Sequence, residues 1–227
     1  MAFLEEQYKT IKEELALTKT TLVAVSKTKP HEDILEAYKS GIKDFGENYV
    51  QELVEKSEQL PKDIRWHFIG HLQTNKVKYI APFVYIIHGV DSEKLLVEIN
   101  KQGQKLNKKI NCLLQIHIAQ EETKFGLNET ELKTILTQLP KLQFVNVIGF
   151  MGMASFTSEQ TLIKKEFDYL KGIFDNSLGL SMANFNPSIL SMGMSADYHL
   201  AVSCGSNMVR IGSLLFGERN KPEAKID

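Results

Sequence analysis

The stretch LVAVSKTKP, residues 22–30, decides the fold. Its first four residues form an uninterrupted apolar run, which is typical of a strand buried on both faces in a parallel sheet. Pro30 suits the first turn of a following helix, and Glu32 and Asp33 lie near the positive end of that helix's dipole. Lys27 is therefore expected just past the carboxyl end of a buried strand, where α/β folds place their chemistry.

The place of Lys27 leaves two interpretations of its side chain. A lysine beside a dry core loses part of its hydration, which favours the neutral amine, a nucleophile that can form a Schiff base. The alternative is a solvated surface lysine, since most lysines are exposed. The choice depends on what the rest of the chain brings to the same end of the strands.

Strand and helix patterns alternate along the whole chain, which predicts a parallel sheet. Eight such units in 227 residues favour a single (β/α)₈ barrel of the TIM type, in one domain spanning residues 1–227. A helix over residues 3–17 precedes the first strand and is expected as an extra N-terminal helix on the outside. A doubly wound open sheet is the alternative. The predicted strands are 22–25, 42–46, 66–70, 84–88, 112–118, 145–151, 189–191 and 208–211.

Polar residues ahead of the helical stretches predict where the helices begin. A side-chain oxygen at such a position can accept a hydrogen bond from a free backbone N–H of the first turn. The expected caps are Asn48 with Gln51, Asp91 or Ser92, Asn128 with Glu131, Thr157 or Ser158, and Ser195.

Composition excludes several classes of protein. Hydrophobic residues make up 43% and charged residues 24%, as in a soluble globular domain, and no apolar run approaches the ~18 residues of a membrane span. The net charge of −1 argues against a nucleic-acid binder. No secretory signal is visible, and Cys112 and Cys204 lie too far apart in sequence for a CxxC motif. We therefore expect a cytoplasmic protein without disulfides.

Two glycine-containing loops are predicted beside Lys27, after the seventh and eighth strands. They read SMGMS at residues 191–195 and RIGS at residues 210–213. These positions of a barrel commonly bind phosphate, because glycine lets backbone N–H groups approach an anion and the helix that follows attracts negative charge. Ordinary turn chemistry is the alternative for either loop alone. The candidate phosphate contacts are Ser191, Gly193, Ser195, Gly212 and Ser213.

Arg210 ends the eighth strand and is expected to point into the same mouth. It stays protonated, so it can donate a hydrogen bond to a ligand but cannot supply a proton. A structural ion pair with a carboxylate such as Glu47 is the alternative. A nucleophilic lysine beside a phosphate cradle suggests an aldehyde phosphate held as a Schiff base, and pyridoxal phosphate is the common biological case. Aldolases of phosphorylated sugars fit the same pattern.

His67 and His71 form an H-x₃-H pair, but a metal site is not predicted there. A spacing of four does not place both side chains suitably on a strand, and no cysteine or carboxylate stands at ligand spacing. His67 is instead expected to hydrogen-bond in the pocket. Methionines flank the ends of the sixth and seventh strands, and Met151 is the candidate for contact with a ligand ring.

Several segments together carry a resemblance to a known family. They are AVSKTKP (24–30), FGENYVQE (45–52), WHFIG (66–70), KFG (124–126), LSMGMS (190–195) and VRIG (209–212). In these motifs the chain resembles the pyridoxal phosphate homeostasis proteins, which are similar to the N-terminal barrel domain of alanine racemase. The segments span nearly the whole chain, so the resemblance is specific.

The resemblance implies a barrel that carries pyridoxal 5′-phosphate as a Schiff base on Lys27. It implies that Arg210 faces the pyridine nitrogen, that the two glycine loops hold the phosphate, and that Asn48 is a pocket residue. The implied function is intracellular homeostasis of the cofactor, as a carrier or buffer. The alternative is a weak amino-acid racemase or related enzyme.

Two features disfavour broad amino-acid chemistry. Alanine racemase takes a second base from a separate C-terminal domain, which this chain is expected to lack. An arginine at the ring nitrogen would also keep that nitrogen unprotonated, which makes the ring a poor electron sink. One departure from the family is Asn207, where a threonine is usual, so one hydroxyl contact is expected to change. The expected partners are the cofactor and apo-enzymes that accept it, and a monomer is expected.

Overall fold

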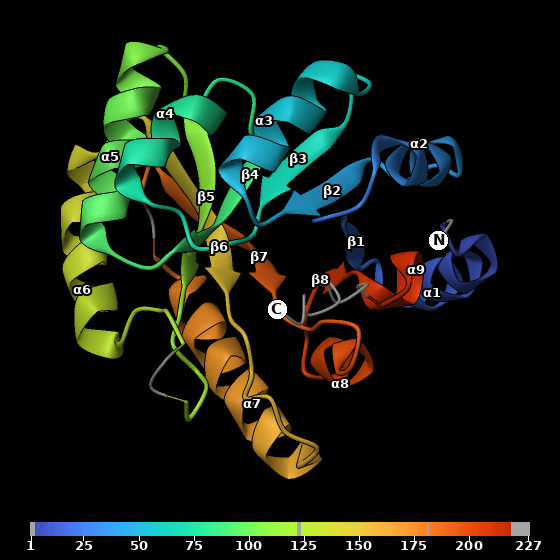
Figure 1. The fold of residues 1–227 in the computed structure, drawn as a ribbon. Coiled ribbons are helices and arrows are strands. Elements are labelled where there is room, and N and C mark those ends of the chain that lie inside the picture. The colour runs from blue at the N-terminus through green and yellow to red at the C-terminus, as the bar shows by residue number, and fades with distance from the viewer. Residues whose placement is uncertain (1–2, 122–123, 181, 219–227) are drawn as a thin grey trace, which may run out of the picture.

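β1 (Thr21–Val25), at the stretch quoted above, pairs in parallel with β2 (Asp44–Glu47) on one side and with β8 (Met208–Ile211) on the other. The computed structural model describes residues 3–121, 124–180 and 182–218, and its parallel strands close into a barrel in chain order (Figure 1). The predicted barrel is confirmed, and the open-sheet alternative is wrong. The remaining strands are β3 (Arg65–Phe68), β4 (Ile86–Val90), β5 (Ile110–Gln115), β6 (Val145–Met151) and β7 (Phe185–Ser191).

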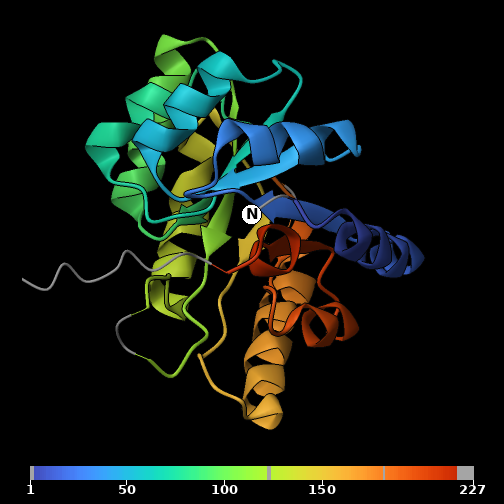
Figure 2. The same ribbon diagram turned by 45° about the vertical axis from the view of Figure 1, so that its right-hand side comes forward.

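Helices surround the strands on the outside (Figures 1 and 2). None of those described is long and apolar enough to cross a membrane. The predicted extra helix, α1 (Glu5–Thr18), lies beside α9 (Ser213–Phe216), where the Leu4 N–H donates to the Leu215 carbonyl at 2.8 Å. The others are α2 (His31–Lys39), α3 (Val50–Gln59), α4 (Val77–Ile80), α5 (Glu93–Lys105), α6 (Glu129–Gln138), α7 (Gln160–Ser177) and α8 (Tyr198–Ser203), with 3₁₀ turns η1 (Thr74–Lys76) and η2 (Leu139–Lys141).

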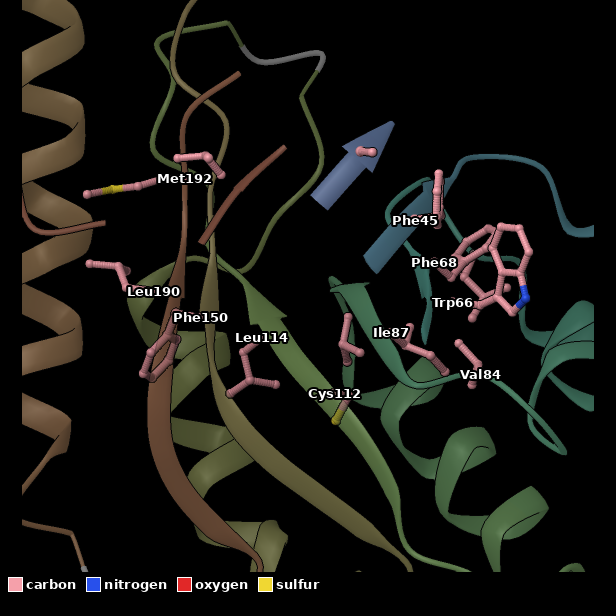
Figure 3. Packing of buried hydrophobic residues seen from close by; sticks show 14 of the residues in the cluster. Phe45, Trp66, Phe68, Val84, Ile87, Cys112, Leu114, Phe150, Leu190 and Met192 are labelled. Atoms are coloured by element: carbon pink, nitrogen blue, oxygen red, sulfur yellow. The ribbon is translucent and has the colours of Figure 1, made fainter. Parts of the chain in front are cut away.

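Each face of the barrel sheet packs against its own hydrophobic core. Because successive side chains point to opposite faces, alternate residues face the helices and the barrel interior. Figure 3 shows the outer core, where Phe45, Trp66 and Phe68 pack between strands and helices. A separate inner cluster fills the barrel and consists of Val23, Ile86, Leu113, Met151 and Met208. Both faces of the sheet are therefore dry, which explains the uninterrupted apolar run of β1.

Asn207 lies at the seam between β7 and β8. Its side-chain oxygen accepts from the Leu190 N–H at 2.8 Å, and its amide nitrogen donates to the Ser188 carbonyl at 2.7 Å. Among the described residues, the backbone of β7 pairs in register with that of β8 only at Ser191 and Met208. The side chain of Asn207 therefore adds hydrogen bonds that extend the pairing between β7 and β8. This bonding assigns Asn207 to the barrel wall rather than to the cavity.

The predicted helix starts are correct in two cases. Ser92 caps α5 by accepting from the Leu95 N–H at 3.3 Å, and Asn128 with Glu131 forms the capping box of α6.

The other starts need correction. Asn48 does not cap α3, which begins at Val50 without a side-chain cap, because the Asn48 side chain lies at the barrel mouth instead. Pro30 is the residue before α2, outside its first turn. Ser195 accepts from the Gly212 N–H at 3.3 Å, and α8 begins only after Asp197. α7 begins after Glu159, beyond both Thr157 and Ser158.

Candidate functional site

A cavity of about 430 Å³ opens at the carboxyl ends of the strands. It lies where the chain leaves β1, β2 and β8 and where the loop after β7 passes. These segments bring together many of the residues predicted for the site, although they are distant in sequence. The predicted residues that line the cavity are Lys27, Asn48, Ser195, Arg210, Gly212 and Ser213.

The other predicted residues are buried beneath this cavity. His67 and Met151 are 0% exposed inside the barrel, so their expected direct contact with a ligand needs correction. They point inward from positions below the strand ends. Met153 lies two residues beyond Met151, toward the mouth, and does line the cavity. Ser191 and Gly193 are also buried and contact Arg210 rather than the cavity.

A tight turn presents Lys27 to the cavity. The Lys29 N–H donates to the Ser26 carbonyl at 3.1 Å, and Thr28 has a φ of 65°, in the left-handed region. A β-branched residue rarely adopts that conformation, so the turn must be held by its surroundings. The Lys27 side chain is half-buried. The Lys27 side chain is therefore only partly solvated and lines the cavity.

The two glycine loops are joined to each other. Ser195 Oγ accepts from the Gly212 N–H at 3.3 Å. Within the described residues, no acceptor contacts the backbone N–H groups of Ser195, Ala196 or Ser213. Free N–H groups converging at a cavity can bind an anion. Gly193 makes the first loop possible: its φ is 97°, and a Cβ there would lie 2.6 Å from the Cβ of Ala201.

Arg210 is buried, with 4% exposure, and is held by neutral acceptors. Nη1 donates to the Ser191 carbonyl at 2.9 Å and to Ser191 Oγ at 2.7 Å, and Nη2 donates to the Gly152 carbonyl at 3.1 Å. Its alternative partner, Glu47, is paired elsewhere. Burial lowers the pKa of Arg210 to about 10, which leaves the guanidinium charged at neutral pH. Its remaining N–H groups have no acceptor among the described residues, and Arg210 lines the cavity.

Lys29, to which the sequence assigned no role, also lines the cavity. Its ammonium donates to the Phe216 carbonyl at 2.5 Å, at the end of α9. Lys27, Lys29 and Arg210 therefore give the cavity a positive lining, which suits an anionic ligand.

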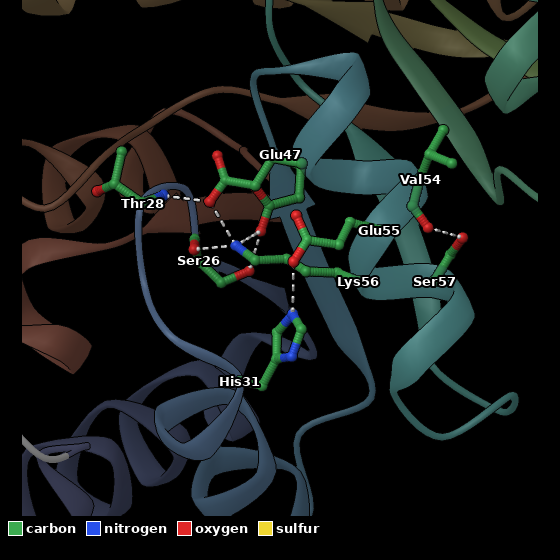
Figure 4. Close-up of polar contacts among 9 residues, drawn as sticks. Ser26, Thr28, His31, Glu47, Val54, Glu55, Lys56 and Ser57 are labelled. Carbon is green, nitrogen blue, oxygen red and sulfur yellow. Dashed lines mark hydrogen bonds and ion pairs between the residues drawn. The ribbon is translucent and has the colours of Figure 1, made fainter.

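A largely buried network of polar contacts holds Ser26 and Thr28, the two neighbours of Lys27 (Figure 4). Lys56 on α3 donates to the Ser26 carbonyl at 2.8 Å, to Glu47 at 2.8 Å and to Glu52 at 2.6 Å. Ser26 Oγ donates to Glu47 at 2.6 Å, and the Thr28 N–H donates to Glu52 at 2.5 Å. These bonds fix both ends of the turn that carries Lys27.

This network was not predicted from the sequence, although the sequence contains a signal for it. Lys56 falls on the helical face that Val50 and Leu53 bury, and an ammonium at such a position needs partners. Val25 and Ile69 were also not predicted as lining residues.

Glu47 should make stability depend on pH. Burial raises its pKa to about 7 from 4.5, against the opposing effect of Lys56. Its contribution to stability is then full below the unfolded pKa and is lost as pH rises through the folded pKa. A Glu47→Gln variant keeps one oxygen for Lys56 and Ser26 and removes the titration. As the pH rises from about 5 to about 8, we expect the free energy of unfolding of the variant to increase by up to about 3 kcal/mol relative to that of the wild type.

Urea denaturation of both proteins at the two pH values measures this difference. A stability difference between Glu47→Gln and wild type that is the same at both pH values would contradict the raised pKa.

His71 is separated from His67 in the structure. His71 Nδ1 lies 2.9 Å from Asp91 and its ring stacks on Phe125, whereas His67 contacts His88 and Asp44 inside the barrel. In the described ranges there is no group of three or more His, Cys, Asp or Glu side chains suited to a metal ion.

Comparison with known proteins agrees with the barrel and with the motifs. The alanine racemase N-terminal domain family matches residues 1–220. The chain belongs to that family. The pyridoxal phosphate homeostasis protein of Pasteurella multocida is 38% identical over 202 residues, which cover 88% of this chain and 86% of the relative. The human protein of the same name is 39% identical, over 88% of this chain and 76% of its own. The resemblance inferred from the motifs is confirmed.

Solved structures of family members have the same fold. PipY of Synechococcus elongatus, in a structure with PLP bound, has a TM-score of 0.84 and 32% identity, and the match covers 94% of this chain and 99% of PipY. Its structure without PLP has a TM-score of 0.88. Alanine racemase from Bartonella henselae has a TM-score of 0.70 at 17% identity, over 96% of this chain and 60% of the enzyme, which supports the fold alone.

The described residues fit a phosphorylated aldehyde. The cavity offers an amine, a protonated arginine and free backbone N–H groups, while the buried Asn48 Oδ1 has no hydrogen-bond partner in the described part of the chain. An orphaned polar atom at a cavity is expected to meet a ligand or water.

Proposed function

We propose that this protein binds pyridoxal 5′-phosphate as a Schiff base on Lys27 and acts as a carrier or buffer in the homeostasis of the cofactor. The observation that carries the proposal is the convergence of Lys27, Arg210 and both glycine loops on one cavity of about 430 Å³. Relatives at 38–40% identity bear the name pyridoxal phosphate homeostasis protein, and PipY at 32% identity has been solved with PLP bound. The cofactor would supply an aldehyde for the lysine, and the protein holds and releases it.

Each residue has a proposed task. Lys27 forms the covalent bond, and Arg210 donates to the ring nitrogen through an N–H group that no other described residue uses. Ser195, Gly212 and Ser213 bind the phosphate through hydroxyl and backbone N–H groups. Asn48 contacts the ring substituents through its orphaned oxygen. Ser191, Gly193, His67 and Met151 support these residues from beneath.

The proposal does not require turnover. Arg210 is charged and donates hydrogen bonds, so a ring nitrogen facing it stays unprotonated and withdraws electrons poorly. We further propose that residues 1–227 act as a single domain and as a monomer. A cytoplasmic location is supported by Cys112 and Cys204, which are both buried free thiols.

Transfer of cofactor to a defined apo-enzyme tests the function. The loaded protein, freed of excess cofactor by desalting, is mixed with a PLP-requiring apo-enzyme, and the return of activity is compared with that from free cofactor at equal concentration. A carrier restores full activity while free cofactor in solution stays low. Failure to retain the cofactor through desalting, or to activate the apo-enzyme, would contradict the proposal.

A weak racemase is the second candidate, because the matching family model describes a domain of alanine racemase. It predicts exchange of the α-hydrogen of an amino acid for deuterium in heavy water, at a rate above that of free cofactor and dependent on Lys27. No exchange above free cofactor removes this candidate.

A further inference from the structure

A row of hydrogen-bonded polar side chains crosses the interior of the barrel beneath the cavity. Asp44 Oδ1 lies 3.0 Å from His67 Nε2, and His67 Nδ1 lies 2.9 Å from His88 Nε2. His88 Nδ1 lies 3.3 Å from Ser191 Oγ, which accepts from Arg210 Nη1 at 2.7 Å. The side chains come from β2, β3, β4, β7 and β8, and none is more than 7% exposed.

The row connects the two ends of the barrel. At its far end Asp44 is held by Arg65, whose Nε donates to Asp44 Oδ1 at 2.7 Å, and both line a second cavity of about 270 Å³. At its near end Arg210 lines the proposed cofactor cavity. The row is therefore a continuous polar path through the interior, beside the apolar inner cluster that includes Val23, Ile86 and Leu113.

If both imidazoles are neutral, hydrogen-bond chemistry allows only one direction for the protons. The Asp44 carboxylate can only accept, so His67 donates from Nε2 and accepts at Nδ1. His88 must then donate from Nε2 to His67 and accept at Nδ1 from the hydroxyl of Ser191. The Ser191 oxygen is thereby left as an acceptor for Arg210, which has only donors.

The electrostatics agree with this direction. Burial would raise the pKa of Asp44, but hydrogen bonds from Arg65 and His67 outweigh it, and the net pKa is lowered, which keeps the carboxylate charged. Burial lowers the pKa of His67 and of His88, which favours two neutral imidazoles. A carboxylate at one end and a guanidinium at the other are thus joined by neutral groups that are all satisfied.

We propose that Asp44, His67 and His88 are positioning residues for Arg210. Together they make the Ser191 hydroxyl donate its proton to His88. The Ser191 oxygen is then available to accept from Arg210 and to orient the guanidinium toward the cavity. The consequence for cofactor binding rests on the proposed function, whereas the proton arrangement does not. The row explains why polar side chains lie in the barrel interior without lining the cavity.

The first experiment concerns the protein without cofactor. Long-range ¹H–¹⁵N correlation spectra of the full chain report which ring nitrogen of each histidine carries hydrogen. We expect His67 and His88 both to be neutral with hydrogen on Nε2. Hydrogen on Nδ1 of either ring, or a charged imidazolium, would overturn the proposed direction.

A matched pair of substitutions separates positioning from packing. The amide oxygen of His88→Asn can occupy the place of Nδ1 and accept from Ser191. His88→Gln places its amide near Nε2 and keeps only the contact with His67. We expect cofactor affinity and absorbance close to wild type in His88→Asn, and affinity weaker by on the order of tenfold, with a shifted spectrum, in His88→Gln.

Equal losses in both variants would mean that His88 only fills space, and would overturn the proposal. Thermal unfolding shows whether both variants are folded. Should His88→Gln fail to fold, Ser191→Ala removes the same acceptor for Arg210, and wild-type affinity and spectrum in that variant would equally overturn the proposal. If the wild-type protein binds no cofactor, the proposed function is wrong. The protonation of His67 and His88 measured without cofactor would still test the proton arrangement.

Discussion

A Lys27→Ala variant is expected to lose the absorbance of lysine-bound pyridoxal phosphate completely and to release the cofactor on desalting. Only an amine can form the Schiff base, and Lys27, the lysine that the family resemblance implies for this bond, lines the cavity on the turn after β1. The remaining contacts from Arg210 and the glycine loops would bind the cofactor only noncovalently, so desalting should remove it. Absorbance spectra before and after desalting, and mass spectrometry after borohydride reduction, measure the loss.

Lys29→Ala is the matched control, because it removes an ammonium from the same turn. Lys29 donates to the Phe216 carbonyl, so its removal should leave the covalent bond in place. A Lys27→Ala protein that keeps the absorbance of the lysine-bound form would refute the assignment, and a Lys29→Ala protein that loses it would move the assignment to Lys29.

The sequence predicted the barrel well because its signals are repetitive. Strand and helix patterns alternate eight times, so an error of two residues at one boundary does not change the topology. β4 illustrates this: it was expected at residues 84–88 and is found at Ile86–Val90, yet it takes its place between β3 and β5.

The site was predicted less completely, because the sequence of a strand does not show how far below the mouth of the barrel each of its residues lies. Met151 and Met153 point the same way, and only the curvature and closure of the barrel decide which of them reaches the cavity. His67 was taken for a pocket residue for the same reason. Its partner His88 comes from a different strand, and no spacing rule links the two.

Local rules failed where a polar side chain lies at the barrel mouth instead of capping the helix that follows it. Asn48 has the sequence of a helix cap, but its side chain is used at the barrel mouth. Ser195 likewise bonds to Gly212 across two loops rather than to its own helix. The closed barrel supplies Ser195 with a partner far away in the sequence, whereas Asn48 Oδ1 has no hydrogen-bond partner among the described residues.

Arg210→Glu is expected to weaken cofactor binding by about 100-fold or more, since it replaces a donor with a buried carboxylate. The guanidinium donates to Ser191 and to the Gly152 carbonyl, and a carboxylate can satisfy neither carbonyl. A carboxylate beside the ring nitrogen would also favour its protonation, so the absorbance of residual bound cofactor should shift. Equilibrium titration and absorbance spectra measure the two effects.

Arg210→Gln is the control for the charge, because its amide can still donate one hydrogen bond without placing an anion in the cavity. We expect a smaller loss of affinity and no sign of a protonated ring, since glutamine neither repels the phosphate nor stabilises a pyridinium. A folded Arg210→Glu protein with the affinity and spectrum of the wild type would show that Arg210 does not face the ring. The contrast between the variants matters because a donor at this position lets the protein hold the cofactor while suppressing the electron withdrawal that amino-acid chemistry needs.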